Sequence, residues 1–403
     1  MPTPNLHPVS DWLLHHVSRQ ATGDEFLDQL SQLLREHGVP LSRASFSVRT
    51  CHPEISTCNF TWSLGEGSRK GPTLHFDLLQ PAYQNSPVAL VIDGVGPIRR
   101  RLTGPDAKLD FPICRELAEQ GATEYFILPL QFSDERRTYV SFCTDGEAGF
   151  SDEHIDLLTE IAPFLALRAE LASSYYATTT LLQLYLGRTA ARRVLEGNFK
   201  RGGGDAIEAA LWYCDLRGFS EIAEHRSPVE AVELLDSFFE CVADAIRDAG
   251  GEILKFIGDG VLAIFDFADS DPATACQRAV DAALRALQGV ERWNTHRSEG
   301  DSPLKMGVAL HVGSLLHGNI GSRERLDFTV IGAAMSEVCR LEPLCRTIGV
   351  PLVMSNRFVE LHSERDLVGM GRFVLRGKPE PQEVYSLRRV LPRVRRAAVR
   401  SRA

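Results

Sequence analysis

The spacing of apolar residues divides the chain into segments of different periodicity. Residues 8–37 carry apolar positions three and four apart, which predicts an amphipathic helix that stops at Gly38. Residues 42–148 instead hold short apolar runs separated by Gly, Pro, Asp and Asn. These runs predict an antiparallel sheet with intervening loops. They are ASFSV, TLHFDLL, VALVI, YFILPL and YVSFCT.

A long helical pattern follows, from about Asp152 to Gly197. Its apolar positions recur close to every seventh residue, which is typical of a helix that packs along a seam. The seam consists of Ile155, Leu158, Ile161, Leu165, Ala169, Ala172 and Tyr176. We expect a helix of this length to bury its seam in a parallel homodimer. FKRGGGD at 199–205 then predicts a flexible break.

From residue 206 to about 387, strands and helices alternate. The first strand, LWYCDL, ends near Asp215 and turns through Gly218, and Ser227 caps the helix that follows. EILKFIGDGVLAIF then predicts a hairpin with Asp259 at its tip. If this hairpin pairs beside the first strand, the two aspartates converge at one sheet edge. Paired carboxylates suit Mg²⁺ or Mn²⁺, and two such ions can promote phosphoryl displacement.

Composition narrows the class of protein. A length of 403 residues suggests about two to three domains, and 44% hydrophobic with 24% charged residues is globular. No apolar run approaches the about 20 residues of a membrane helix. The N-terminus lacks the order of a secretory signal, and the nine cysteines form no CxxC pair. We therefore expect a cytoplasmic protein with reduced thiols and no transmembrane segment.

The net charge of −9 hides an asymmetry. Residues 388–402 carry seven arginines and no acid, so the remainder has a charge of −9 − 7 = −16. An acidic body argues against nucleic acid as a partner. The basic tail, 388–403, is expected to be a solvated terminus, with anionic lipid or a partner protein as the alternative.

Three motifs resemble, in order, those of class III nucleotidyl cyclases. DLRGFS at 215–220 is similar to the first metal motif of that family, and GGEILKFIGDG at 250–260 is similar to the second. FTVIG at 328–332, leading to RLE at 340–342, is similar to the third. The resemblance spans 205–387. It implies a ferredoxin-like catalytic domain with helices mainly on one face, and a head-to-tail homodimer with active sites between the protomers.

The resemblance also implies roles for single residues. Asp215 and Asp259 would hold two Mg²⁺ or Mn²⁺ ions per active site. The backbone amides of the turn at Arg217, Gly218 and Phe219 would meet phosphate oxygens. Arg340 of the other protomer would stabilise charge on the α-phosphate. Arg376 or Lys378 would reach the terminal phosphates. Taken singly, Asp215 fits a turn cap equally well, and Arg340 fits an ion pair with Glu337 or Glu342.

Two positions bear on the choice between adenine and guanine as the purine base of the substrate. Lys255 aligns with the purine-reading lysine of the family and can donate to adenine N1, and Thr329 aligns with its partner position. Guanylate-type members usually have Glu and Cys there, so the pair favours ATP. Ser336 stands where the family usually has the Asn that orients the ribose. Serine is shorter but keeps a donor, which puts the turnover rate in question.

Helix-plus-sheet composition over about 25–170 resembles a GAF-type sensor domain. We therefore expect a GAF-like regulatory domain at 1–150, a signalling linker helix at 151–204, a cyclase domain at 205–387 and the basic tail. The expected activity is conversion of ATP to 3′,5′-cyclic AMP and pyrophosphate. An unidentified small molecule or protein would act on the N-terminal domain. The alternatives are a guanylate cyclase, or a degenerate nucleotide-binding module, which Ser336 favours.

Overall fold

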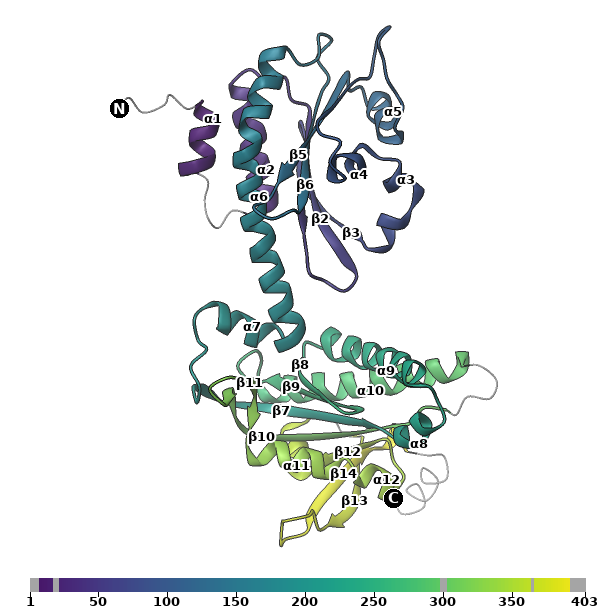
Figure 1. Ribbon diagram of the computed structural model, residues 1–403. Helices are drawn as coiled ribbons and strands as arrows, with labels where there is room; N and C mark the ends of the chain where they lie inside the picture. The colour runs from purple at the N-terminus through teal and green to yellow at the C-terminus, as the bar shows by residue number, and fades with distance from the viewer. Residues whose placement is uncertain (1–6, 17–21, 298–302, 364–365, 392–403) are drawn as a thin grey trace. The chain divides into compact units, whose positions relative to one another are not determined.

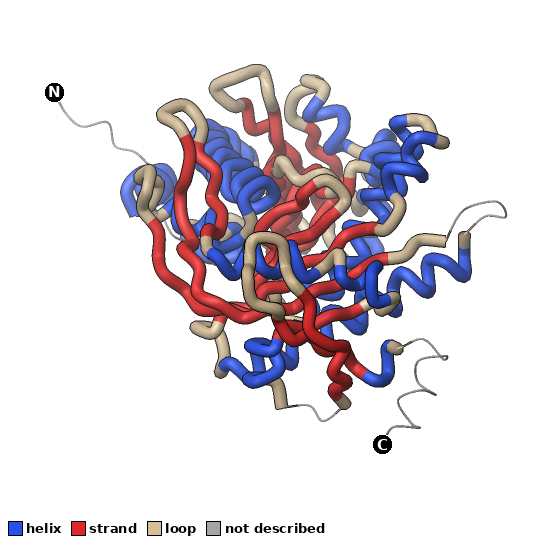
Figure 2. The backbone as a smooth tube through the Cα atoms, turned by 90° about the horizontal axis from the view of Figure 1, so that it is seen from below, coloured by secondary structure: helices blue, strands red, loops and turns tan. Residues whose placement is uncertain are grey.

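The structure, a computed structural model, describes residues 7–16, 22–297, 303–363 and 366–391. The chain divides into two units, Met1–Leu184 and Tyr185–Ala403. Each unit is built around one sheet, whose strands are red in Figure 2 beside the blue helices.

An antiparallel sheet of six strands, in the order β3-β2-β1-β6-β5-β4, forms the first unit. The strands are β1 (Arg43–Arg49), β2 (Ile55–Ser63), β3 (Gly67–Leu74), β4 (Ile98–Arg101), β5 (Glu124–Gln131) and β6 (Arg137–Thr144). The antiparallel sheet expected over 42–148 is thus confirmed. The strand expected at VALVI is wrong, because Ser86 caps helix α4 (Pro87–Ile92) there. In TLHFDLL, the strand ends at Leu74 and a 3₁₀ turn follows, Phe76–Leu79.

Helices cover both faces of this sheet (Figure 1). Helices α2 (Gly23–Glu36) and α6 (Asp152–Leu186) cover one face, and α4 with α5 (Pro112–Glu119) covers the other. The alternation along β5 explains this, since Phe126 and Leu128 face α6 while Tyr125 and Ile127 face α5. The short helix α3 is Pro81–Gln84.

The single helix expected over 8–37 is interrupted. Helix α1 (Pro8–Asp11) passes into a π-helical turn, Trp12–His16, and residues 17–21 lie outside the described residues. A new helix, α2, begins at Gly23, where the side chain of Glu25 accepts a bond from the backbone amide of Thr22. This capping box is a helix start signal in the middle of the apolar periodicity.

Helix α6 is shorter than expected and its seam is already covered. It ends at Leu186, Gly187 adopts φ +84°, and α7 (Arg188–Leu195) begins anew. The seam residues Leu158, Ile161 and Leu165 are buried against the sheet of their own unit. The seam therefore does not provide the dimer contact that we expected. A different stripe of α6 is exposed, consisting of Leu167, Leu171, Tyr175, Leu181 and Tyr185.

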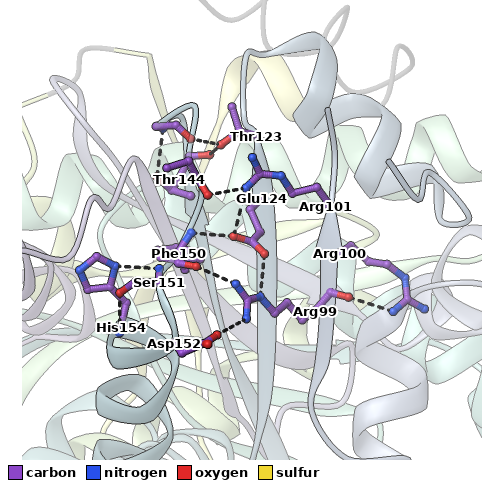
Figure 3. A network of polar contacts seen from close by, with 12 residues as sticks. Arg99, Arg100, Arg101, Thr123, Glu124, Thr144, Phe150, Ser151, Asp152 and His154 are labelled. Atoms are coloured by element: carbon purple, nitrogen blue, oxygen red, sulfur yellow. Dashed lines mark hydrogen bonds and ion pairs between the residues drawn. The ribbon is translucent and has the colours of Figure 1, made fainter. Parts of the chain in front are cut away.

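A polar network joins the sheet to the start of α6 (Figure 3). The side chain of Glu124 is only 4% exposed, and it accepts bonds from Arg99 Nε at 2.7 Å and from the Phe150 amide at 2.6 Å. Arg99 also donates to the Phe150 carbonyl at 2.6 Å and lies 3.5 Å from Asp152, the first residue of α6. Arg101 adds a bond to the Ala148 carbonyl. These contacts fix where α6 leaves the sheet.

The second unit has an eight-stranded sheet of order β13-β14-β12-β10-β7-β9-β8, with β11 paired to β10. Its strands are β7 (Gly204–Leu216), β8 (Glu252–Ile257), β9 (Gly260–Asp266), β10 (Met306–Gly321), β11 (Leu326–Ile331), β12 (Leu352–Ser355), β13 (Leu367–Phe373) and β14 (Gln382–Leu387). Its helices after α7 are α8 (Phe219–Glu224), α9 (Pro228–Asp248), α10 (Pro272–His296), α11 (Ala333–Leu341), α12 (Leu344–Ile348), α13 (Asn356–Leu361) and a 3₁₀ turn, Arg388–Val390. The central order β10-β7-β9-β8 with α9 and α10 is a βαββαβ unit, as a ferredoxin-like fold requires.

Helices cover both faces of this sheet, which corrects the expectation of one covered face. Trp212 and Cys214 of β7 pack in one core cluster with α9 and α10, whereas Ala209 and Leu211 pack in another with α11 and α12. The strand is apolar on both sides, so its pattern is a continuous run with no alternation.

Local contacts define the start of β7, the start of α7 and the beginning of the basic tail. Of the glycine run expected to be a flexible break, Gly204 already belongs to the sheet, because it begins β7 opposite Gly318. Thr189 at the start of α7 donates to Glu252 of β8, from its amide at 2.9 Å and from its hydroxyl at 2.6 Å. At the basic tail, Arg388 lies 3.7 Å from Asp366, and residues 392–403 lie outside the described residues.

Candidate active site

Two aspartates come together where β7 ends. Asp215 is the second-last residue of β7, and Asp259 lies in the turn between β8 and β9. Gly260 lets this turn approach β7 closely, since a Cβ there would lie 2.7 Å from Tyr213 Oη and 2.9 Å from the Cys214 carbonyl. The hairpin and turn were expected from the sequence, and the pairing of β9 with β7 brings the two carboxylates to one edge.

The pKa values of both carboxyl groups lie above the ordinary value of an aspartate. Burial, and then the charge of Asp259, raise the pKa of Asp215 to about 6. Burial also raises the pKa of Asp259. A divalent cation would relieve this repulsion, and Mg²⁺ is commonly held by one or two carboxylates plus substrate phosphates. Within the described ranges no three His, Cys, Asp or Glu side chains form a group that could hold a metal ion.

Glu342, just beyond the end of α11, is a third carboxylate here. Its Oε1 lies 2.0 Å from where a Cβ on Gly307 would stand, and Gly307 is paired with Asp215 across β10 and β7. Burial, and then the charge of Asp215, raise the pKa of Glu342 to about 7, while Arg217 opposes this rise. From the sequence, Glu342 was expected only as an alternative ion-pair partner of Arg340, within the RLE segment at 340–342. In the sequence, the indication that Glu342 has a specific role was the presence of a charged residue next to helix positions that are buried.

The turn after β7 offers fewer free amides than we expected. Gly218 adopts φ +77° and starts α8, a conformation that favours glycine. The Arg217 amide donates to the Lys305 carbonyl at 2.7 Å and is therefore engaged. The Arg217 side chain donates to the Val350 carbonyl at 2.7 Å. Of the three predicted phosphate-binding amides, Gly218 and Phe219 therefore stay candidates.

Lys255 has a partner on β11 that the sequence analysis missed. Its ammonium forms an ion pair with Asp327, which stands two residues before Thr329 on the same strand. Residues two apart in a strand point to one face, so Asp327 and Thr329 share a face. A register shift between Ile253 and Lys255 in the β8–β9 pairing marks a bulge beside the lysine. In the sequence, the spacing of two residues between Asp327 and Thr329 was the available indication that both lie on one face of the strand.

Helix α11 carries the predicted transition-state residues on its exposed side. Ser336 and Arg340 are both exposed and are one turn apart. The Arg340 guanidinium lies against the 376–378 loop, because a Cβ on Gly377 would be 3.2 Å from its NH1. Arg376 in that loop is exposed.

Lys378 is engaged within its own chain. It forms an ion pair with Glu337 of α11, and His311 Nε2 lies 3.8 Å from the same carboxylate. Burial lowers the pKa of His311 to about 4, and its Nδ1 is 2.8 Å from Ser355 Oγ. Arg376 is thus the more accessible of the two candidate cations for the terminal phosphates.

Strand register separates two groups of candidate residues. Thr329 is paired with Gly318, which in turn is paired with Gly204 at the start of β7. Asp215 stands at the other end of β7, eleven residues further on. The carboxylate pair and the Thr329 position therefore belong to opposite ends of this strand.

Comparison with known proteins decides the family. Residues 206–388 match the family model of the adenylate and guanylate cyclase catalytic domain. These residues belong to that family. We call residues 206–388 the cyclase domain. In the described part of the chain, none of the helices carries an apolar stretch long enough to cross a membrane.

Relatives of the cyclase domain include named cyclases. An adenylate cyclase of Anabaena cylindrica is 31% identical over 167 residues, which are 40% of this chain and 32% of that protein. Adenylate cyclase 1 of Rhizobium meliloti is 27% identical over 207 residues, 51% of this chain and 31% of that protein. The chain thus spans about a third of the length of these curated relatives.

A solved structure shares the fold. The structure of a bacterial light-regulated adenylyl cyclase is 18% identical, with a TM-score of 0.50, and covers 66% of this chain and 87% of that chain.

Proposed function

We propose that the chain is a cytoplasmic adenylate cyclase that converts ATP to 3′,5′-cyclic AMP and pyrophosphate. The observation that carries this proposal is the juxtaposition of Asp215 and Asp259, whose raised pKa values reflect an uncompensated carboxylate pair. Such a pair at a strand end is suited to divalent cations and triphosphate.

Asp215 and Asp259 would hold two Mg²⁺ or Mn²⁺ ions per active site. Bound there, the ions would lower the pKa of the ribose 3′-hydroxyl and neutralise the triphosphate. The amides of Gly218 and Phe219 would donate to phosphate oxygens, and Arg376 would meet the terminal phosphates. Arg340 would donate to the α-phosphate as charge develops there in the transition state. Ser336, one turn away, would hydrogen-bond the ribose.

The site requires two protomers in this proposal. Thr329 and the carboxylate pair belong to opposite ends of β7, and Lys255 forms an ion pair with Asp327 on the strand that carries Thr329. In the proposal, one chain supplies the metal ligands and a second chain supplies Lys255, Thr329, Ser336 and Arg340. Ser336 and Arg340 are exposed on α11, as residues that serve a partner must be. Leu181 and Tyr185, which are exposed near the end of α6, offer apolar surface for a parallel homodimer.

ATP is the proposed substrate because Lys255 can donate to adenine N1, whereas guanine carries a proton there. The ion pair with Asp327 holds this lysine beside Thr329. In the experiment that tests the proposal, purified protein is incubated with Mn²⁺ and either ATP or GTP, and the cyclic product is identified. Cyclic AMP with little cyclic GMP supports it, and the reverse preference contradicts the base assignment.

A second candidate is a degenerate module that binds nucleotide without turnover. Ser336 in place of the usual asparagine favours it. Binding of a non-cleavable ATP analogue, with no cyclic product under Mg²⁺ or Mn²⁺, would support this candidate. The Ser336→Asn variant discriminates further, since a gain in turnover identifies a slow enzyme.

The first unit is proposed to be a GAF-like regulatory domain that receives an unidentified signal. Its two-sided antiparallel sheet and its direct continuation into α6 support a sensor role. Removal of residues 1–184 tests this proposal, because unchanged cyclase rate and regulation in the remainder would contradict it.

A further inference from the structure

The first unit contains a cavity that the proposed cyclase chemistry does not use. Its volume is about 560 Å³, within the about 300–1,000 Å³ of pockets that hold small organic molecules. Helix α2, strands β1, β5 and β6, and helix α6 contribute most of its lining residues. Seven of its sixteen lining residues come from α6, more than from any other element.

The interior of this cavity is apolar. Its deep wall includes Leu27, Leu30, Val48 and Val140, each at most 1% exposed. Phe26 and other aromatic and aliphatic residues complete this wall. Such a surface gains free energy when it covers a hydrocarbon chain, and it offers few hydrogen-bond partners for a nucleobase, a ribose or a sugar.

One positive charge stands in this apolar setting. Among the described residues that line the cavity, Arg168 is the only charged one. Its Nε donates to the Leu13 carbonyl at 3.2 Å. A guanidinium can bind a carboxylate through two parallel hydrogen bonds, as it can a phosphate. Leu171 and Tyr175 also line the cavity, are more than 60% exposed, and mark its mouth.

We propose that this cavity binds a monocarboxylate with a single apolar chain, of the fatty-acid type. The carboxylate would meet Arg168, and the chain would lie between α2 and the sheet. A second copy of the protein, docked along α6, would cover Leu171 and Tyr175 at the mouth. It could not reach Leu30 or Val140 inside, so a small molecule fits the cavity better than a protein surface does.

Isothermal titration calorimetry of the full-length chain tests the proposal without any nucleotide, so its outcome is independent of cyclase activity. The probes are octanoate, decanoate and 1-decanol. We expect decanoate to bind more tightly than octanoate, by about fourfold per added methylene. We expect the alcohol to bind at least about tenfold more weakly than decanoate, because it lacks the charge. No binding of decanoate, or equal binding of acid and alcohol, overturns the proposal.

Two variants locate the site. Arg168→Gln should weaken decanoate about tenfold and leave 1-decanol unchanged. Ala172→Phe fills the cavity and should abolish binding of both probes, whereas Ala177→Phe, on the same helix but outside the lining, should not. Decanoate binding that is unchanged in Arg168→Gln contradicts the site even if Ala172→Phe fails to fold. If decanoate does not bind and Ala172→Phe instead changes the oligomeric state of the protein, the surface is a contact site for a second copy of the chain, and the proposal is overturned.

Discussion

The carboxylate of Glu342 occupies the space that a side chain on Gly307 would need. A Cβ at position 307 would lie 2.0 Å from Glu342 Oε1 and 3.0 Å from Cys345 Cβ. Gly307 is also the register partner of Asp215 on β7. A third acidic group therefore reaches the carboxylate pair only because position 307 has no side chain.

Gly307→Ala should displace Glu342 and destabilise the second unit by about 1–3 kcal/mol, because a buried residue is overpacked. It should also lower cyclase turnover, since the displaced carboxylate alters the charge beside Asp215. Urea unfolding and initial rates measure the two effects. Gly369→Ala is the matched control, since its Cβ would meet Tyr385 only at 4.0 Å. Equal behaviour of the two variants contradicts this account.

The effect of metal on stability should depend on pH. The folded pKa of Asp215 is about 6, against an ordinary value of 3.8. The folded state thus retains this proton more strongly, and the stability due to this group is lost as pH rises through about 6. Divalent ions bind the ionised form. The rise in melting temperature with Mn²⁺ should therefore be larger at about pH 8 than at about pH 5.5.

Asp215→Asn and Asp259→Asn should each remove this Mn²⁺-dependent rise and abolish cyclic product. Asp236→Asn on α9, away from the site, serves as control. A rise that persists in both variants would place the metal elsewhere.

Mixed dimers should recover activity if each active site is shared. Asp215→Asn and Arg340→Ala should each be inactive alone. An equal mixture, after exchange of subunits, should regain about one quarter of the wild-type rate, because half the dimers are mixed and each has one intact site. Product formation measures this recovery. A mixture that stays inactive, although mass analysis shows mixed dimers, contradicts the shared site.

The ion pair between Lys255 and Asp327 should position the base-reading lysine. Asp327→Asn should raise KM for ATP about two- to fivefold and narrow the preference over GTP, with a smaller change in kcat, because an exposed pair contributes about 0.5–1 kcal/mol. Asp244→Asn, which breaks the exposed pair with Arg247 on α9, is the control. Steady-state kinetics with ATP and GTP measure these changes. Equal KM values and equal nucleotide preference in the two variants would contradict the positioning role of Asp327.

The buried carboxylate of Glu124 should stabilise the first unit. Glu124→Gln places an amide group against the donors of Arg99 and Phe150, and should cost about 1–3 kcal/mol in the free energy of unfolding. Asp152→Asn changes a side chain that is 98% exposed in the same network, and should cost less than about 0.5 kcal/mol. Urea unfolding measures both free energies of unfolding. Equal losses in the two variants would contradict a special role for the buried Glu124 carboxylate.

Much of the site could be predicted from local sequence. The Ser227 cap of α9, the left-handed Gly218 and the turn at Asp259 all follow from short-range rules, and the structure has each of them. The convergence of Asp215 with Asp259 followed from one assumption about strand pairing, which β9 and β7 satisfy.

Other features depend on contacts between distant segments. Asp327, far along the chain from Lys255, meets it only because β11 folds back toward β8. The seam of α6 has the same period whether it packs on a second helix or on a sheet, so Leu158 and Leu165 could not reveal their partner. VALVI is apolar in either state, and the Ser86 cap decided for helix.

The two bonds from Thr189 to Glu252 join α7 to the strand that carries Lys255, three residues further along. Through these bonds, a displacement of Gly187 and α7 would be transmitted to β8 and so to Lys255, the proposed purine-binding residue. In the proposed cyclase, such a displacement would alter the affinity for nucleotide, and regulation would therefore show first in substrate affinity.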